Sequence, residues 1–250
     1  MADEVLLSAK NLTKRFGGLA AVNDVSVDLW RGRIHAVIGP NGAGKSTLTN
    51  LLSGDLAPTT GTIHLGGAET TGRSPEKIAR AGLGRSYQKT NIFLPFTVWE
   101  NVRLAAQSRA QRPASWLSRA TGHSATNERA ENALVLAGLE HRRDVVAGTI
   151  SHGEQRQLEI AMTLATEPQV LLLDEPLAGM GTVEAESMVA LLQRLKAAHA
   201  IMLVEHDMDA VFALADRLTV MVNGQVIASG TPPQIRADAG VRAAYLGEEH

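Results

Sequence analysis

The chain contains no cysteine. Disulfide bonds and thiolate chemistry are therefore excluded, and cysteine usage says nothing about the redox compartment. Long apolar runs are also lacking, because no stretch approaches the roughly 20 residues that a membrane-crossing helix needs. The start, Met1 to Glu4, is acidic and lacks the pattern of a secretory signal. A role at a membrane would therefore require docking to a protein that spans it.

An excess of charge of one sign is missing as well. The 24 basic and 26 acidic residues give a formal net charge of -2, and the basic residues form no long run. Nothing in this balance predicts nucleic acid as a partner. Hydrophobic residues make up 44% of the chain and charged residues 20%, as in folded proteins, and 250 residues suffice for one large core or a core plus a subdomain.

The spacing of hydrophobic residues divides the chain into regions of two kinds. Period-two alternation or short apolar runs predict strands, and helical spacing predicts helices between and after them. From 97 to 167 helical spacing dominates, interrupted by a polar insertion between Gln107 and Asn127. We therefore predict an α/β fold in which residues 1–96 and 168–250 form a catalytic core with a mostly parallel sheet and an antiparallel β subdomain, and residues 97–167 form a helical subdomain. The predicted strands cover 5–11, 20–29, 34–38, 61–65, 170–173, 201–204 and 218–222, and the predicted helices include 46–53 and 184–198.

A glycine-rich loop follows the apolar run Ile34–Ile38. Its residues are Gly39, Pro40, Asn41, Gly42, Ala43, Gly44, Lys45, Ser46 and Thr47. The pattern is that of a phosphate-binding loop, in which glycines let backbone N–H groups converge on phosphate oxygens at the start of a helix. Lys45 is expected to reach the β- and γ-phosphates, Ser46 to bind Mg²⁺, and Thr47 to add a phosphate contact. A coincidental glycine-rich turn is the ordinary alternative, but the strand before the loop and the helix after it favour binding of ATP or GTP.

Two acids follow a second buried run. Val170 to Leu173 is apolar and leads directly into Asp174 and Glu175. Because parallel strands deliver their C-terminal residues to the ligand-binding edge of a sheet, we expect Asp174 to hold Mg²⁺ and Glu175 to polarise the attacking water. In isolation such a pair is more often a solvated helix cap, but the upstream phosphate loop favours catalysis.

Three further motifs carry a family resemblance. Ile150 to Gln155 resembles the signature motif of ATP-binding cassette (ABC) ATPases, Gln88 stands where that family has its Q-loop, and His206 stands where it has its switch histidine. Taken one at a time, each residue has an ordinary structural interpretation: a loop glutamine or histidine is usually just solvated, and Ser151 could be a helix N-cap. Their order and spacing over essentially the whole chain identify a member of the ABC family.

The resemblance implies roles for these residues. Ser151, Gly153 and Glu154 would contact the ATP held by a second nucleotide-binding subunit, homo- or heteromeric, so that two ATPs lie between two head-to-tail domains. Gln88 would touch Mg²⁺ or the attacking water, and His206 would hold that water with Glu175. Phe16 would stack on adenine, although a lone aromatic is more often packing, and Val22 would lie at the same nucleotide.

The sequence also departs from the family pattern. His152 replaces the first signature glycine, and Gly181 stands where the family usually has Asp or Asn. The second departure concerns communication between subunits more than ATP binding.

Within the family, the chain looks most like branched-chain amino acid importer ATPases. The similarity lies in Phe16–Leu19 with Ala21–Asn23, in Gly84–Gln88, in the polar insertion and in the ending Tyr245–Glu248. It implies an ATPase at the cytoplasmic face of the inner (plasma) membrane, bound to permease subunits and served indirectly by a solute-binding protein, with no nucleic acid partner. We expect the permease to dock near Asn91 to Leu94, although these apolar residues could instead belong to a core. Urea or amide import, lipopolysaccharide export, a soluble ABC protein of DNA repair or translation, and a binding module without turnover are the alternatives.

Overall fold

The chain folds into two compact units, seen in a computed structural model that describes residues 4–86, 91–110 and 124–243. The sheet unit comprises residues 1–83, 169–175 and 196–250, and the helical unit comprises residues 84–168 and 176–195. The predicted boundaries at 97 and 167 remain a prediction of subdomain organisation. The helical unit additionally contains residues 84–96 and most of helix α6.

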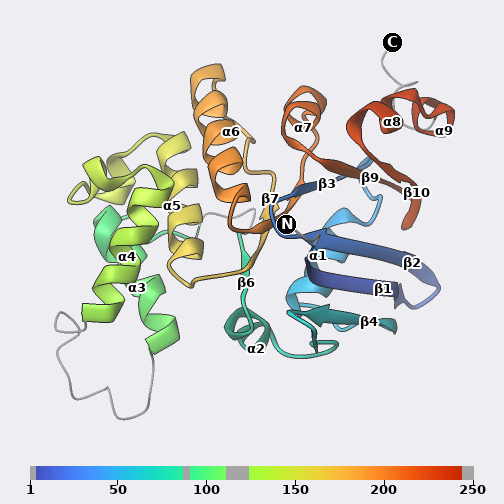
Figure 1. Cartoon of the computed structure of the whole chain (residues 1–250), viewed down its shortest axis with the longest axis horizontal. Coiled ribbons are helices and arrows are strands. Elements are labelled where there is room, and N and C mark those ends of the chain that lie inside the picture. The colour runs from blue at the N-terminus through green and yellow to red at the C-terminus, as the bar shows by residue number, and fades with distance from the viewer. Residues whose placement is uncertain (1–3, 87–90, 111–123, 244–250) are drawn as a thin grey trace. The chain divides into compact units, whose positions relative to one another are not determined.

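The chain is built from strands and helices, which Figure 1 shows coloured in chain order. The strands are β1 (Val5–Phe16), β2 (Leu19–Trp30), β3 (Ile34–Ile38), β4 (Thr60–Leu65), β5 (Ala68–Glu69), β6 (Leu83–Arg85), β7 (Val170–Asp174), β8 (Ala200–Val204), β9 (Arg217–Val222) and β10 (Gln225–Gly230). The helices are α1 (Lys45–Ser53), α2 (Pro75–Arg80), α3 (Val98–Ala110), α4 (Ser124–Ala137), α5 (His152–Leu164), α6 (Thr182–Lys196), α7 (Met208–Leu214), α8 (Pro232–Ala237) and α9 (Ala239–Val241), with short 3-10 turns at Glu140–Arg142 and Ala147–Thr149.

The larger sheet has the strand order β10-β9-β3-β8-β7-β6. Strands β7, β8, β3 and β9 run parallel, and β10 is antiparallel to β9. Every residue of β3, β7 and β8 is buried, as expected for parallel strands covered on both faces. This sheet confirms the predicted α/β fold. The second sheet, β2-β1-β4-β5, is antiparallel and confirms the predicted β subdomain.

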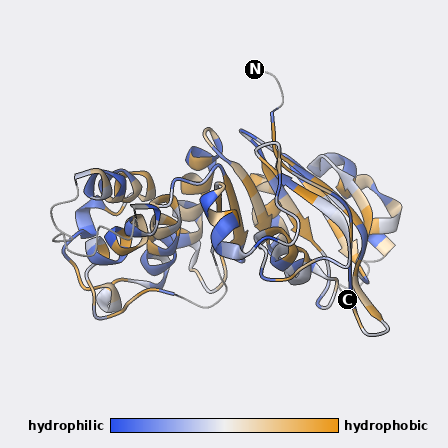
Figure 2. Cartoon of the chain, turned by 90° about the horizontal axis from the view of Figure 1, so that it is seen from below, coloured by the Kyte–Doolittle hydropathy of each residue, from blue (hydrophilic) through white to orange (hydrophobic). Residues whose placement is uncertain are grey.

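One hydrophobic core joins the two sheets with helix α1. Leu48, Leu51 and Leu52 of α1 are buried in the same cluster as Leu6 and Val22 of the antiparallel sheet and as Val37, Val170 and Met202 of the larger sheet. The strands of this unit carry mainly hydrophobic residues (Figure 2). Because replacing one buried leucine by alanine typically costs about 2–5 kcal/mol, this packing fixes the position at which α1 begins.

A buried histidine interrupts the apolar strand β3. His35 is 3% exposed, and its Nδ1 lies 3.2 Å from the carbonyl oxygen of Asp28. Because a carbonyl only accepts, Nδ1 carries the proton, and Nε2 accepts from the Thr219 hydroxyl at 2.8 Å. Burial, aided by the charge of Arg217, lowers the pKa of His35 to about 4 from its ordinary 6.5. The neutral ring is therefore part of the folded structure.

Acid is expected to destabilise the sheet unit through His35. Its folded pKa lies below the unfolded value, so the unfolded chain binds the extra proton first, and stability present above pH 6.5 is lost as the pH falls towards 4. The shift corresponds to about 3 kcal/mol. Between pH 7.5 and pH 4, the free energy of unfolding measured in urea should fall by about 3 kcal/mol more for wild type than for His35→Gln. Equal decreases in the two proteins would contradict this prediction.

The helical unit is built on α3, α4 and α5, which pack against one another. Its helices carry hydrophobic and hydrophilic residues side by side (Figure 2), as expected for helices with one buried face. Among the residues that the structure describes, no helix is both long and apolar enough to cross a membrane.

Candidate active site

The phosphate loop connects β3 to α1, as the sequence predicts. Helix α1 begins at Lys45, and its N-cap is Gly44, whose φ of 101° is in the left-handed region. Within the described chain, no side chain caps this helix end by a hydrogen bond, and its first turn has no acidic residue. The N–H groups and the positive end of the helix dipole therefore suit an anion such as a phosphate.

Lys45 lies folded over the loop. Its Nζ donates to the carbonyl oxygens of Gly39 at 2.5 Å and Pro40 at 3.0 Å. Partial burial lowers the pKa of Lys45, and the nearby charges of Glu175 and Asp174 oppose that change. The three charged groups therefore share one region of the sheet unit. Ser46 is exposed and Thr47 half-buried, so both can be reached by a ligand.

The two predicted acids follow β7. Asp174 is the last residue of the strand and is 3% exposed, whereas the Glu175 side chain is one-third exposed. Glu175 adopts a φ of 50°, and its N–H donates to the Val204 carbonyl at 2.8 Å. A non-glycine residue in this conformation is uncommon. The left-handed turn at Glu175 ends the strand and is secured by a bond to β8.

His206 lies beside Glu175 because β7 and β8 are parallel neighbours whose ends are in register, with Asp174 opposite Val204. The His206 Nδ1 is 3.8 Å from Glu175 Oε1 and 3.9 Å from Glu205 Oε2. The His206 side chain is 64% exposed and therefore accessible to a ligand. Glu205, only 1% exposed, was not among the predicted residues, because nothing but its place before His206 marks it.

The donor set of this edge suits magnesium. Asp174 offers a carboxylate and Ser46 a hydroxyl, and such hard oxygen ligands, completed by water and substrate phosphates, are what Mg²⁺ prefers. Among the described residues, no cluster of three or more His, Cys, Asp or Glu forms an all-protein metal cage. The residues thus fit an ion bound together with a nucleotide.

The signature residues lie at the start of α5 in the helical unit. Ser151 is the N-cap, with its hydroxyl oxygen accepting from the Glu154 N–H and its own N–H donating to the Glu154 carboxylate. This capping box gives Ser151 and Glu154 a structural role. Burial acts to raise the pKa of Glu154, but the Ser151 N–H, together with Arg142, which binds the same carboxylate at 2.7 Å, holds this pKa below its ordinary value.

A glutamate that was not predicted contacts the same motif. Glu184, in the first turn of α6, accepts a hydrogen bond from the Ser151 hydroxyl at 2.8 Å and one from the Gly153 N–H at 3.3 Å. The Ser151 hydrogen bond is the main cause that lowers the pKa of Glu184. Nothing in the sequence pairs residues 33 positions apart on two different helices.

The remaining predicted site residues have mixed surroundings. Phe16 is 49% exposed, with Lys14 Nζ 5.3 Å from its ring centre, so it can receive an adenine. Val22 is completely buried in the core, which gives its side chain a packing role. Gln88, residues 111–123 of the polar insertion and Tyr245–Glu248 lie outside the described residues.

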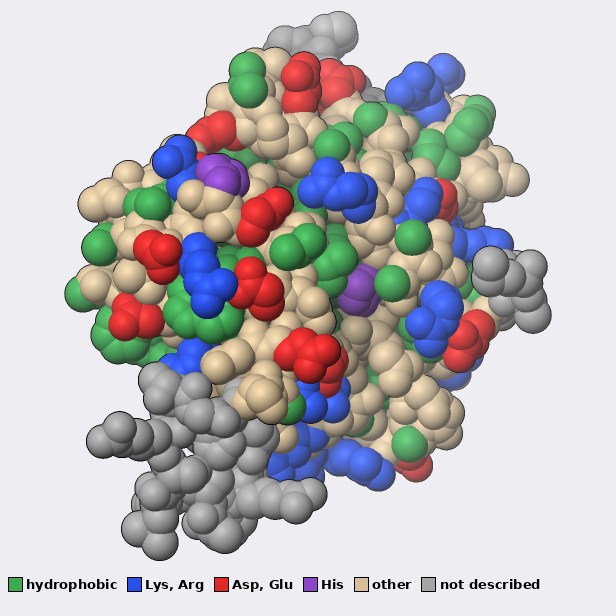
Figure 3. All heavy atoms as spheres, turned by 60° about the vertical axis from the view of Figure 1, so that its left-hand side comes forward, with side chains coloured by type: hydrophobic (Ala, Val, Ile, Leu, Met, Phe, Trp, Pro, Cys, Tyr) green, Lys and Arg blue, Asp and Glu red, His purple; other side chains and the backbone are tan. Residues whose placement is uncertain are grey.

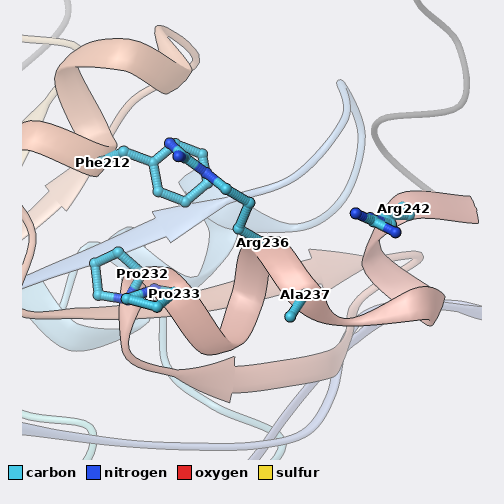
Figure 4. A pocket seen from close by; sticks show the side chains of 6 residues that line it. All are labelled: Phe212, Pro232, Pro233, Arg236, Ala237 and Arg242. Atoms are coloured by element: carbon cyan, nitrogen blue, oxygen red, sulfur yellow. The ribbon is translucent and has the colours of Figure 1, made fainter.

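A pocket of about 550 Å³ lies elsewhere in the sheet unit, among residues of the C-terminal helices (Figure 4). Arg236 stacks over the Phe212 ring at 4.3 Å. The lining residues are Phe212, Pro232, Pro233, Arg236, Ala237 and Arg242, and none of these belongs to a predicted motif. Across the face drawn in Figure 3, basic and acidic side chains are interspersed.

The chain is similar to known transport proteins over nearly its full length. Residues 22–178 match the family described as ABC transporter, and residues 225–250 match the one described as branched-chain amino acid ATP-binding cassette transporter. The latter segment includes all of the pocket residues except Phe212.

Individual relatives and a solved structure agree. The high-affinity branched-chain amino acid transport ATP-binding protein LivG of Escherichia coli K12 is 40% identical over 97% of this chain and 98% of its own. BraF of Pseudomonas aeruginosa, described in the same words, is 39% identical over the same shares. The crystal structure of an ATP-binding cassette of an ABC transporter in its ADP conformation superposes with a TM-score of 0.87 at 30% identity, covering 98% of this chain and 100% of that one.

Proposed function

We propose a transport role for this chain, which belongs to the ABC transporter ATP-binding proteins of the branched-chain amino acid (LivG/BraF) type. It is an ATPase subunit, and it powers the import of branched-chain amino acids through partner proteins in the membrane. The observation that carries this proposal is the full-length likeness to LivG and BraF, joined to a sheet edge where Lys45, Glu175 and His206 meet.

The sheet unit supplies the groups for hydrolysis. Bound phosphates take the place of the carbonyls that now accept from Lys45, because a phosphate is the stronger acceptor. Glu175 holds and deprotonates the attacking water, and His206 orients that water beside it. Mg²⁺, held by Ser46 and Asp174, would neutralise charge on the phosphates.

The helical unit supplies a second half-site. Ser151 and Gly153 carry donors at the N-terminus of α5, where an anion is favoured. In the proposed assembly they bind the γ-phosphate of the ATP held by a second nucleotide-binding subunit, so each ATP is enclosed by two chains. Binding of two ATPs closes the pair, and hydrolysis reopens it.

An exposed apolar segment in the helical unit supports docking to a permease. Phe93, Leu94 and Phe96 are 48%, 48% and 41% exposed, and the two aromatic rings stack at 5.3 Å. The buried Asn101 holds the backbone of Phe93, accepting from the Phe93 N–H at 2.7 Å and donating to its carbonyl at 3.1 Å. An exposed apolar patch on a fixed backbone is typical of a protein–protein interface, which supports docking to a permease from the cytoplasmic face of the membrane.

Reconstitution tests this function. Proteoliposomes containing the chain, its permease subunits and the solute-binding protein are expected to accumulate labelled leucine only with ATP inside. Phe93→Ala should reduce this uptake at least tenfold, because the coupling contact is lost, while the ATPase activity of the chain without permease stays unchanged. Leu136→Ala, a substitution at an equally exposed apolar residue of α4, is the control and should transport normally. Accumulation of urea or a short amide, but not of leucine, would refute the assigned solute.

A further inference from the structure

The anion-binding donors of the signature motif already have an acceptor within the chain. Glu184 Oε1 accepts from the Ser151 hydroxyl at 2.8 Å and from the Gly153 N–H at 3.3 Å, and Oε2 accepts from the Gly181 N–H at 3.4 Å. One carboxylate therefore joins the start of α5 to the loop that precedes α6. It presents one acceptor oxygen, Oε1, and a negative charge to the N-terminus of α5, as an oxygen of a phosphate group would.

The contact leaves no space for a second acceptor. A Cβ built on Gly153 would lie 2.8 Å from Glu184 Cδ and 2.9 Å from its Oε1, so the carboxylate lies directly against the signature backbone. A serine hydroxyl has a single proton to donate, and a backbone N–H likewise. A phosphate oxygen can take these two protons only after Glu184 has left them.

Charge strengthens the competition. The Ser151 hydroxyl, with help from the N–H groups of Gly153 and Gly181, lowers the pKa of Glu184, so the group is ionised at neutral pH. An ionised carboxylate repels the γ-phosphate as well as occupying its donors. His152, which replaces a glycine of the family motif, is among the charges that favour the ionised form.

We propose that Glu184 is an internal competitor that occupies the phosphate half-site of the signature motif until the ATP of the second subunit displaces it. This proposal rests on the composite site of the proposed function. When a binding-competent state is only partly populated, the apparent affinity of the ligand falls by that fraction. If the donors are free about one tenth of the time, removing Glu184 lowers the ATP concentration needed to close the site about tenfold.

The test uses the chain purified with its partner subunits. Steady-state phosphate release is measured against ATP concentration for wild type, Glu184→Ala, Glu184→Gln and the control Glu186→Ala. Glu186 is exposed on the same helix and carries the same charge, so its removal controls for net charge. The KM for ATP is expected to fall about tenfold for Glu184→Ala, about threefold for Glu184→Gln, whose neutral oxygen is a weaker acceptor, and to stay unchanged for Glu186→Ala.

A second measurement separates this effect from the phosphate loop. Binding of a fluorescent ATP analogue to the isolated chain at dilutions where it is monomeric should be equal for wild type and Glu184→Ala. An unchanged or increased KM for Glu184→Ala would overturn the competitor role, an increase indicating that Glu184 instead holds the donors in place. A complex that releases no phosphate at any ATP concentration would overturn the proposed function itself.

Discussion

Replacing Glu175 with glutamine is expected to lower the steady-state rate of phosphate release about a thousandfold and to leave ATP binding intact. A positioned general base contributes roughly 10²- to 10⁴-fold to a reaction rate, and an amide cannot take the proton of the attacking water. Glutamine keeps the size of the side chain, so the phosphate loop is undisturbed. Phosphate release by the complex and binding of a fluorescent ATP analogue by the chain provide the two measurements.

The structure supplies a matched control in Glu205. Both carboxylates approach His206 Nδ1, at 3.8 Å for Glu175 and 3.9 Å for Glu205, but Glu205 is 1% exposed and accepts from the backbone N–H of His206 at 3.2 Å. A buried group has no access to the attacking water, so Glu205→Gln should change the rate only severalfold. A Glu175→Gln chain that hydrolyses ATP at the wild-type rate, or a larger loss in Glu205→Gln, would remove Glu175 from its assigned role.

Much of the sheet edge could be predicted from the sequence because each of its parts is local. Val170–Leu173 is a continuous apolar run and Ile34–Ile38 is interrupted only by His35, and parallel pairing then brings the residues that follow them together. The pairing of His206 with Glu175 is implied by the family resemblance, and the register of the parallel strands β7 and β8 accounts for it. The buried state of His35 could not be predicted, because one histidine within an apolar run can face either a core or solvent.

Contacts between distant helices could not be predicted. Glu184 lies in a polar stretch at the start of α6, and its partners Ser151 and Gly153 precede it by about 30 residues. Such a contact depends on the positions of α5 and α6 relative to each other. Hydrophobic periodicity indicates which face of a helix is buried, but not which residues of another helix that face meets. The prediction that Ser151 is a helix N-cap is confirmed, since its oxygen accepts from the Glu154 N–H. Its signature role stays a prediction, and its proton is donated to Glu184.

Substituting alanine for Gly44 is expected to lower the free energy of unfolding by about 4 kcal/mol, the second large effect. Gly44 has a φ of 101°, and a Cβ there would lie 2.3 Å from the backbone oxygen of Ala21. That oxygen belongs to β2, directly before the buried Val22, and cannot move away cheaply. Conformational strain of a residue at positive φ contributes about 1 kcal/mol, and forced overlap in a packed region about 3 kcal/mol.

Gly42 separates these two costs. It has a φ of 80° in the same loop, but a Cβ there would meet no described atom within 4 Å. Gly42→Ala should therefore lower the free energy of unfolding only by the cost of the strained conformation, about 1 kcal/mol, as measured by urea unfolding followed by circular dichroism. An equal decrease in the free energy of unfolding of both variants would show that the loop needs these glycines for their backbone conformation alone. A loss about 3 kcal/mol larger for Gly44→Ala shows instead that β2 must approach the loop this closely for α1 to begin at Lys45, where its N-terminus meets the phosphates.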